Sequence, residues 1–286
     1  MTWIALALVR IDLHTHSTAS DGTDPPAEVM RRAAVAGLDV VALTDHDTLA
    51  GHREARDALP PGLALLTGME LSCRLDDRSV HMLAYGVDPG NAELAAECAA
   101  IVAARVGRAQ AMVEALRGLG VDITWPQVRA LAPGGVVGRP HIARAMVAAG
   151  AIASPDEAFT ADWIGAGGRA YVSRYALDPV AAIGLIRAAG GVAVLAHPRA
   201  VSRAEQLSEA TIAELAAAGL AGLEVAHPDH DPAVRQRLAG LAASLDLVAT
   251  GGSDDHGSLT GYRIGCETTS PQAYERLMSL TSGDPA

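Results

Sequence analysis

The sequence predicts an α/β fold, a mainly parallel sheet or barrel interrupted by a helical insertion. Two observations on patterning support this. Short apolar segments alternate with helical segments in the first third of the chain and again after about residue 170. Between residues 91 and 169 the pattern is helical throughout. A third observation is composition: half of the 286 residues are apolar, which is enough to bury a large core.

The first predicted strand, residues 9–13, is apolar or β-branched around one aspartate, and His14 and His16 follow it. Residues two positions apart in an extended chain point to the same side, so the two imidazoles converge. Asp21 follows in a Ser-Asp-Gly turn. Neutral imidazoles with a carboxylate suit a divalent transition ion, although this segment alone fits two ordinary polar residues equally well.

The next elements continue the alternation. A helix is predicted over residues 24–36, because proline is tolerated in a first turn and Gly37 ends it, and a short helix over 52–59. Three strands are predicted, namely residues 40–43 before Asp45, His46 and Asp47, residues 63–66 before Glu70, and residues 80–87 with His81 at the start. Asp45 and Asp47 either orient imidazoles or form a surface turn.

The alternation then breaks. Four helices are predicted, at residues 92–119, 125–131, 140–149 and 155–164. We therefore expect residues 1–90 and 170–286 to form one barrel, and residues 91–169 to form a helical insertion that caps the substrate site.

The last part restores the alternation. Helices are predicted at residues 179–189, 211–218 and 232–244, and strands at residues 191–196 before His197, 222–225 before His227, and 247–250 before Asp254 and His256. This gives seven strands in total. Strand ends on one rim of a β/α protein are where that fold class places its chemistry.

Composition excludes several partners. With a net charge of −11, the chain has no sequence-wide electrostatic footprint for duplex nucleic acid, and 3% aromatic residues give little support to base-stacking platforms. No apolar run approaches the roughly 20 residues of a membrane span, and the apolar N-terminus lacks the basic region of a signal peptide. Cys73, Cys98 and Cys266 are odd in number and widely spaced, which indicates a reduced, cytoplasmic chain.

The candidate metal ligands share a position at or near predicted strand ends. They are His14, His16, Asp21, His46, Glu70, His81, His197, Asp254 and His256. One ion takes roughly four to six ligands, some of them water, so this set predicts two or three divalent ions, of Mn, Zn or Fe.

In this order the motifs resemble those of the PHP (polymerase and histidinol phosphatase) family of metal-dependent phosphoesterases. The resemblance covers nearly the whole chain and rests on His14-Thr15-His16, Thr44-Asp45-His46, His197-Pro198 and Ser253-Asp254-Asp255-His256. Within the family the sequence most resembles the stand-alone branch that removes the 3′-phosphate of nucleoside 3′,5′-bisphosphates and trims short 5′-phosphorylated RNA.

This resemblance implies a distorted (β/α)7 barrel with three ions. It implies one ion at His14, His16, Glu70 and Asp254, a second at Glu70, His81 and His197, and a third at Asp21, His46 and His256. Glu70 would bridge the first two ions. Asp21, His46, Glu70 and His256 are also the expected catalytic residues. Ions of this kind make hydroxide available near neutral pH and cancel charge on the phosphoryl oxygens.

Basic residues of the insertion are the candidate substrate contacts. Arg105 and Arg108 share a helix face, while Arg139 and His141 open another helix, whose N-terminal N–H groups favour an anion. Arginine forms bidentate hydrogen bonds with phosphate, which suits the second phosphate of a bisphosphate. A solvated helix face is the alternative for all four.

Other polar residues are weaker candidates. Arg169, Tyr171 and Arg174 follow the insertion and form a third group for substrate contact. His227 and His230 lie on the same rim without being needed as ligands, and His52 is expected to be exposed in a helix without function.

Three functions compete. The first is hydrolysis of a nucleoside 3′,5′-bisphosphate or of a short 5′-phosphorylated single strand. The second is a histidinol-phosphate-type phosphatase, which the arginines of the insertion disfavour because they suit two phosphates. The third is a metal-binding polymerase accessory module without turnover, which the complete ligand set disfavours. The ion identity, the proton donor to the leaving group and the oligomeric state stay open.

Overall fold

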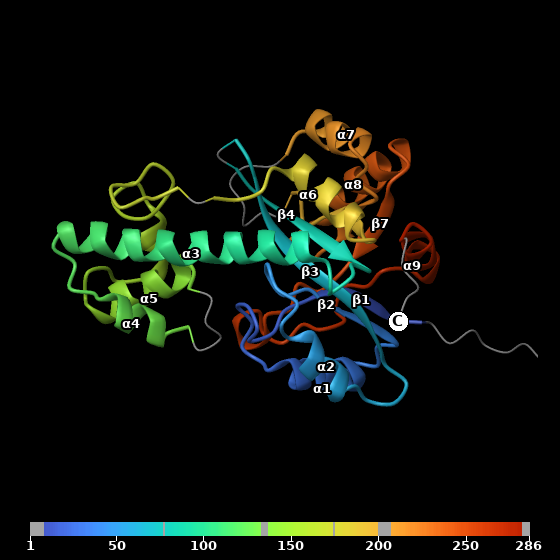
Figure 1. Cartoon of the computed structure of the whole chain (residues 1–286), viewed down its shortest axis with the longest axis horizontal. Coiled ribbons are helices and arrows are strands. Elements are labelled where there is room, and N and C mark those ends of the chain that lie inside the picture. Colours follow the sequence, from blue (N-terminus) through green and yellow to red (C-terminus); the bar gives the residue numbers. More distant parts are fainter. Residues whose placement is uncertain (1–8, 77, 133–136, 174, 200–206, 282–286) are drawn as a thin grey trace, which may run out of the picture. The chain divides into compact units, whose positions relative to one another are not determined.

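The structure is a computed structural model that describes residues 9–76, 78–132, 137–173, 175–199 and 207–281. The chain divides into two compact units (Figure 1). One contains the residues up to Ala96 together with those from Leu177 onward, and the other is Glu97–Ala176. None of the described helices is long and apolar enough to cross a membrane.

The first unit is built on a sheet in which, among the described residues, seven strands follow one another in chain order. They are β1 (Ile11–Thr15), β2 (Val40–Leu43), β3 (Ala64–Leu75), β4 (Arg78–Tyr85), β5 (Val192–Leu195), β6 (Gly222–Ala226) and β7 (Val248–Gly251). A parallel bridge from Thr15 to Asp255, just after β7, brings the two edges together, so the sheet is a nearly closed barrel. The predicted α/β barrel of seven strands is confirmed.

One strand breaks the parallel arrangement. β4 runs antiparallel to both β3 and β5, so the expectation of parallel strands is wrong at this position. β3 ends at Leu75 and β4 begins at Arg78, and so short a connection joins only antiparallel strands. The reversal brings the start of β4 to the end of the barrel where β5 finishes, since Ala196 N–H donates to the His81 carbonyl. His81 therefore reaches the same rim as side chains that follow parallel strands.

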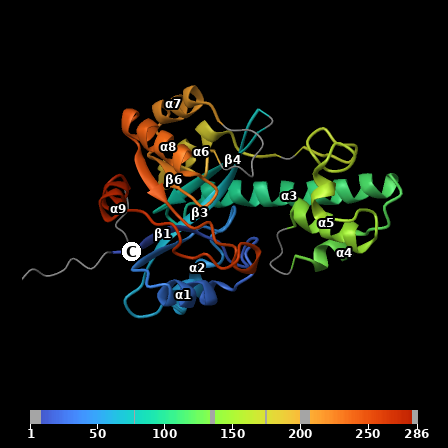
Figure 2. The same ribbon diagram turned by 180° about the vertical axis from the view of Figure 1, so that it is seen from behind.

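Helices surround this sheet (Figure 2). They are α1 (Pro26–Val35), α2 (His52–Asp57), α6 (Pro179–Ala188), α7 (Glu209–Ala217), α8 (Pro232–Ser244) and α9 (Pro271–Met278), with a 3₁₀ turn at Gly257–Leu259. Side chains of Asp178, Ser208, Asp231 and Ser270 accept N–H groups of the first turns of α6, α7, α8 and α9, which satisfies donors that a helix start leaves unpaired. The sequence analysis did not predict α9.

Apolar and polar residues alternate along β1, which separates the core residues from the residues of the site. Ile11 and Leu13 join a buried cluster with Leu83, Tyr85 and residues of α9. Asp12, His14 and His16 are the alternate residues, and all three are buried as well. A period of two therefore places apolar groups on one face of the strand and polar groups on the other.

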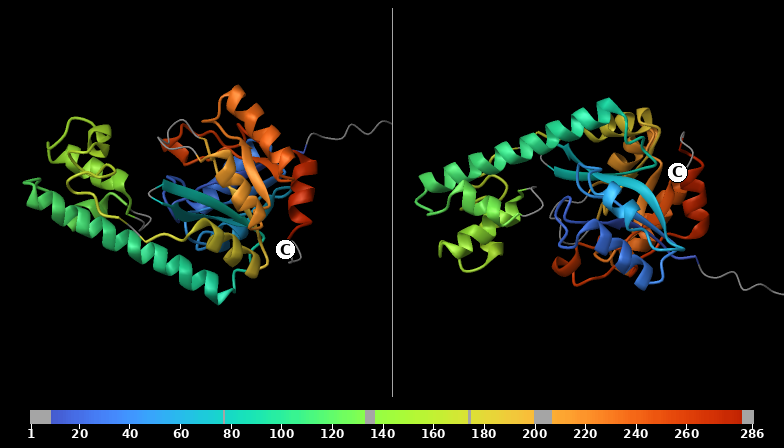
Figure 3. Two further views of the ribbon diagram at one scale, coloured as in Figure 1. Left: turned by 90° about the horizontal axis from the view of Figure 1, so that it is seen from above. Right: turned by 60° about the horizontal axis from the view of Figure 1, so that its bottom comes forward.

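The second unit has a core of its own. It contains most of the long helix α3 (Ala92–Gly118), together with α4 (Trp125–Ala130), α5 (Arg139–Ala148) and a 3₁₀ helix at Pro155–Phe159. Both views of Figure 3 show α3 as one continuous helix. Met112, Leu116, Ile142 and Met146 are fully buried in one cluster of this unit. No strand occurs in its described residues.

Candidate metal centre

Glu70, on β3, is the hub of a cluster of imidazoles. Its side chain is 1% exposed, so little solvent reaches the carboxylate. Oε1 lies 2.6 Å from His81 Nδ1 and 2.9 Å from His197 Nε2. Oε2 faces three further nitrogens, His14 Nε2 at 3.3 Å, His16 Nε2 at 3.3 Å and His46 Nδ1 at 3.2 Å. The two carboxylate oxygens of Glu70 thus face two different groups of imidazoles. A ligand that bridges two ions requires this arrangement.

Asp254 completes a first group of four. Its Oδ1 lies 3.3 Å from His14 Nε2 and 3.2 Å from His16 Nε2. With one ligand atom from each residue, the donors of His14, His16, Glu70 and Asp254 lie within 4.8 Å of one another. These are the residues expected to hold the first ion.

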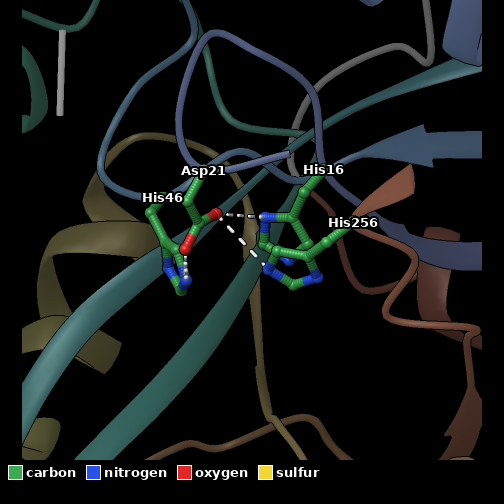
Figure 4. Close-up of side chains that lie close together, drawn as sticks. All are labelled: His16, Asp21, His46 and His256. Carbon is green, nitrogen blue, oxygen red and sulfur yellow. Dashed lines mark ion pairs between the residues drawn. The ribbon is translucent and has the colours of Figure 1, made fainter. Parts of the chain in front are cut away.

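Asp21 organises a second group of four (Figure 4). Its Oδ1 lies 3.3 Å from His256 Nε2 and 3.7 Å from His16 Nδ1, and its Oδ2 lies 3.5 Å from His46 Nε2. The carboxylate thus sits between His46 on one side and the stacked rings of His16 and His256, whose centroids are 4.0 Å apart, on the other. The three residues expected to hold the third ion meet here, joined by His16.

A third group joins Glu70 to His46 and His81. The donors of His46, Glu70 and His81 lie within 4.8 Å of one another. His197, the residue expected here in place of His46, also reaches Glu70, and its ring centroid lies 5.4 Å from that of His81. His16 and His46 each belong to two groups, and a neutral imidazole has only one lone pair to offer. Each of them can therefore serve one ion in that form.

Local backbone geometry brings these donors together. His14 and His16 are alternate residues at the end of β1, and their ring centroids are 5.1 Å apart. Asp254 has φ 48° and His197 φ 24°, in the left-handed region that non-glycine residues seldom adopt. Gly252 passes against β1, where an added Cβ would lie 2.4 Å from the His14 Cβ. Only glycine fits this approach.

The buried charges perturb one another. Burial raises the pKa of Glu70, but His81, His46 and His14 outweigh this and hold the pKa well below its usual range. Burial lowers the pKa of His16, but the nearby carboxylates of Asp254 and Glu70 outweigh this and raise the pKa to about 10. For His46 burial prevails, and the pKa falls to about 3. Carboxylates in this centre are therefore ionised.

The donor set fits divalent cations. Four ring nitrogens of the candidate ligands are buried without a hydrogen-bond partner, namely His14 Nε2, His16 Nδ1, His16 Nε2 and His46 Nδ1. They lie within 3.2–3.7 Å of carboxylate oxygens, but not in hydrogen-bonding geometry. Buried polar atoms are costly when unpaired, and bound cations would pair both the lone pairs and the carboxylates. Nitrogen and oxygen donors in this mixture suit Zn, Mn or Fe.

Two aspartates beside His46 support the surrounding backbone. Asp45 accepts from the Ser17 N–H and hydroxyl and from the Ser20 hydroxyl. Asp47 accepts from the Ser72 N–H and hydroxyl. Both are buried, and their hydrogen bonds tie the residues beside His46 to the segments that carry His16, Asp21 and Glu70.

The structure corrects the expectation for His52. Its side chain is buried, and Nε2 donates to the Gly68 carbonyl at 2.8 Å. His52 lies at the first residue of a short helix, α2, which packs against the barrel. Because α2 is so short, the periodicity of its sequence did not show which of its faces is buried.

Sequence reasoning missed Glu224. This buried residue of β6 contacts His14 and the backbone of His197. The signal was a lone acid within the apolar segment Gly222-Leu223-Glu224-Val225-Ala226. His227 was assigned no ligand role in the sequence analysis. Its Nε2 lies 3.2 Å from Asp254 Oδ2.

The predicted substrate residues lie in the second unit. Arg139 stacks over the Phe159 ring at 5.6 Å, and burial lowers its pKa. The His141 ring accepts the Gly138 N–H through Nδ1, so its neutral form carries a proton on Nε2. Arg108 donates to the Val172 carbonyl and stacks on Tyr171, and Arg105 lies one turn earlier on α3. Of the third group, Arg174 falls outside the described residues.

The fold and the centre together define a class of protein. A nearly closed barrel gathers ionised carboxylates and imidazoles at one rim, in a set that fits several divalent cations. Such a set is typical of hydrolases in which metal ions act on phosphate or acyl groups. Comparison with known proteins narrows this class to one family.

The family model described as the PHP domain matches residues 12–114. A 5′-3′ exoribonuclease of Haemophilus influenzae is 36% identical over 248 residues, 86% of this chain and 90% of the relative. A 3′,5′-nucleoside bisphosphate phosphatase of Chromobacterium violaceum is 35% identical over 258 residues, 90% of each chain. A solved structure from Bifidobacterium adolescentis, provisionally described as a metal-dependent phosphoesterase, has a TM-score of 0.85 and 36% identity over 97% of this chain and 98% of its own.

The chain belongs to the PHP family and is a metal-dependent phosphoesterase, hence a hydrolase. The resemblance found in the sequence motifs is thereby confirmed. Neither relative is named as a histidinol phosphatase or as a polymerase module, so the comparisons do not favour those two alternatives.

Proposed function

We propose that this chain hydrolyses phosphate esters of nucleotides, either the 3′-phosphate of nucleoside 3′,5′-bisphosphates or short 5′-phosphorylated RNA. One observation carries the proposal, the convergence of Asp21, Glu70 and Asp254 with imidazoles in adjoining groups that share ligands. Adjoining groups suit neighbouring cations, which a phosphoester needs because its transition state spreads charge over several oxygens. The names of two relatives, one acting on RNA and one on a nucleoside bisphosphate, support the substrate class.

We assign the nine ligands as the sequence motifs suggest. Three ions are proposed, one at His14, His16, Glu70 and Asp254, one at Glu70, His81 and His197, and one at Asp21, His46 and His256. Bound Mn, Zn or Fe would lower the pKa of water and neutralise phosphoryl oxygens. Glu70 faces five imidazoles at once, while Asp21 lies between His46 and His256 at the third position. Asp21, His46, Glu70 and His256 are the proposed catalytic residues.

The insertion would supply an anion subsite for the second phosphate. Arg139 is the strongest candidate, because its guanidinium is partly desolvated and no described carboxylate pairs with it. His141 presents an Nε2 proton from the first turn of the same helix, α5. Arg105 and Arg108 on α3 are proposed as further contacts. A phosphate bound by Arg139 would replace the lost solvation with charge-assisted hydrogen bonds.

The substrate test compares four compounds on purified protein reconstituted with Mn. These are a nucleoside 3′,5′-bisphosphate, the matching 3′-monophosphate, a short 5′-phosphorylated RNA and histidinol phosphate. We expect kcat/KM to be highest for the bisphosphate or the RNA. Turnover of histidinol phosphate alone, or binding of metal without any turnover, would contradict the proposal.

The subsite test uses Arg139→Gln. We expect KM for the bisphosphate to rise about 10- to 150-fold, while kcat/KM for the 3′-monophosphate stays unchanged, because the lost charge-assisted contact is worth about 1.5–3 kcal/mol. Arg144→Gln is the matched control, since Arg144 is exposed on the same helix and donates to the Leu131 carbonyl. An equal loss for both substrates would exclude a role in binding the second phosphate.

A cytoplasmic location is part of the proposal. Cys73, Cys98 and Cys266 are all free thiols, as a reducing compartment permits. We expect a small anionic phosphoester or a short single strand as the partner, and neither duplex DNA nor a membrane, given the net charge of −11.

A further inference from the structure

Glu224 is a buried carboxylate in a strand that supplies none of the proposed ligands. It lies in the middle of β6, is 1% exposed and is flanked by apolar neighbours. A buried charge is costly unless it is paired and hydrogen-bonded, so its contacts must compensate for lost solvation. Both oxygens are used, and each reaches a different residue of the metal centre.

The first oxygen fixes the ring of His14. Glu224 Oε1 lies 2.9 Å from His14 Nδ1, and because a carboxylate only accepts, Nδ1 must carry the proton. In the neutral ring the lone pair is then on Nε2. That nitrogen is buried without a hydrogen-bond partner, 3.3 Å from both Glu70 Oε2 and Asp254 Oδ1. Glu224 thereby makes His14 a ligand at the nitrogen that faces the other donors.

The second oxygen holds the backbone of His197. The His197 N–H donates to Glu224 Oε2 at 2.8 Å. His197 has φ 24° and precedes Pro198, and a left-handed residue of this kind costs roughly 1–3 kcal/mol unless its surroundings hold it. The bond to Glu224 compensates for this strain. In that conformation His197 Nε2 reaches Glu70 Oε1 at 2.9 Å.

We propose that Glu224 is a positioning residue that presents His14 and His197 to the metal ions, one through each carboxylate oxygen. The inference rests on the proposed metal centre and deepens it, since it assigns a role to a residue that binds no ion itself. Histidine ligands commonly donate their second N–H to a carboxylate, and loss of that partner typically weakens metal binding 10- to 100-fold. Here one carboxylate serves ligands from two different parts of the sheet, His14 on β1 and His197 just after β5.

Glu224→Gln is the sharpest test because it keeps the size of the side chain. The glutamine oxygen can accept from His14 or from His197, but its NH₂ group meets the other donor. We expect Mn binding to the metal-free protein, measured by isothermal titration, to weaken 10- to 100-fold. We also expect the Mn concentration for half-maximal hydrolysis to rise in parallel, with KM for the phosphoester unchanged. If Glu224→Gln changed only the stability of the fold, both Mn measurements would stay at their wild-type values.

Thr250→Val is the matched control. Thr250 pairs with Glu224 across β6 and β7, is buried, and has a hydroxyl without a hydrogen-bond partner. The change is similar in size and lies beside Glu224, so Mn affinity should stay at the wild-type value. A similar loss in both variants would show that general disturbance of β6, and not the carboxylate, weakens metal binding.

A second variant covers the case in which Glu224→Gln does not fold. Glu224→Asp keeps the charge but shortens the reach by one methylene, so Mn affinity should fall to an intermediate value. Wild-type affinity in every folded Glu224 variant would overturn the inference. Wild-type protein that binds no Mn would instead overturn the proposed metal centre, so the two failures are distinguishable.

Discussion

At the residue scale, the centre depends on a few carboxylates that each face several imidazoles. Asp21 contacts His16, His46 and His256, and these contacts hold its pKa well below the usual range despite burial. Asp21 is the carboxylate of its group of four, so its removal leaves that group with three imidazoles and no acidic ligand. Substitutions here should affect chemistry more than folding.

Asp21→Ala and His256→Ala should each lower kcat by about 100-fold or more, since loss of a cation removes about 3 kcal/mol or more of transition-state stabilisation. The fold should persist, as judged by circular dichroism, and elemental analysis should find fewer ions per chain. Asp57→Ala is the control, because it makes the same change in charge at an exposed position of α2. Full turnover in either site variant would refute the assignment of the third ion.

At the element scale, close packing of β1 against the segment after β7 fixes the position of His14. A Cβ on Gly252 would lie 2.4 Å from the His14 Cβ and 2.7 Å from the His14 backbone nitrogen. These atoms belong to a buried strand and cannot move aside without shifting β1. The barrel closes at this point, so its geometry and the site geometry are linked.

Gly252→Ala should lower the free energy of unfolding by about 1–3 kcal/mol, as overpacking does, and should weaken Mn binding because His14 is displaced. Urea denaturation and Mn titration measure the two effects. Gly240→Ala on α8 is the control, since a Cβ there meets nothing within 4 Å. It should stabilise by roughly 0.5–1 kcal/mol, because alanine favours a helix interior over glycine. Unchanged stability of Gly252→Ala would contradict the close approach.

At the scale of the whole molecule, each of the two units has buried clusters of its own among the described residues. The cluster around Met112 and Ile142 contains residues of the second unit alone, while the clusters around Leu83 and Met30 belong to the first. The candidate ligands all belong to the first unit. Metal binding should therefore stabilise one unit and leave the other nearly unchanged.

Removal of metal by a chelator should lower the unfolding temperature of the first unit by about 5–10 °C, if ions at 100 times their Kd contribute about 2.7 kcal/mol. Calorimetry follows both units. Tryptophan fluorescence of a Trp3→Phe variant follows the second unit, because the remaining Trp125 and Trp163 lie there. That fluorescence transition should not move. Equal shifts of both transitions would show that the units unfold together.

Prediction from the sequence succeeded where a pattern is local. Alternating strands and helices gave the barrel, and polar residues at strand ends gave the candidate ligands that the structure brings together. It failed at two positions, one decided by packing between elements and one by a short connection that the predicted strand bounds did not include. His52 is buried by packing of α2, and β4 is reversed by the short connection from β3.

The sequence by itself determined the fold class, the family and the residue types of the centre. Strand periodicity and short motifs depend only on residues close together in the chain, so they can be recognised without the tertiary structure. Only the tertiary structure decided that Glu70 is the hub, that His16 and His46 each face two groups, and that Glu224 supports His14 and His197. Those relations join strands up to 210 positions apart. The distances between such residues depend on barrel closure, which no local pattern encodes.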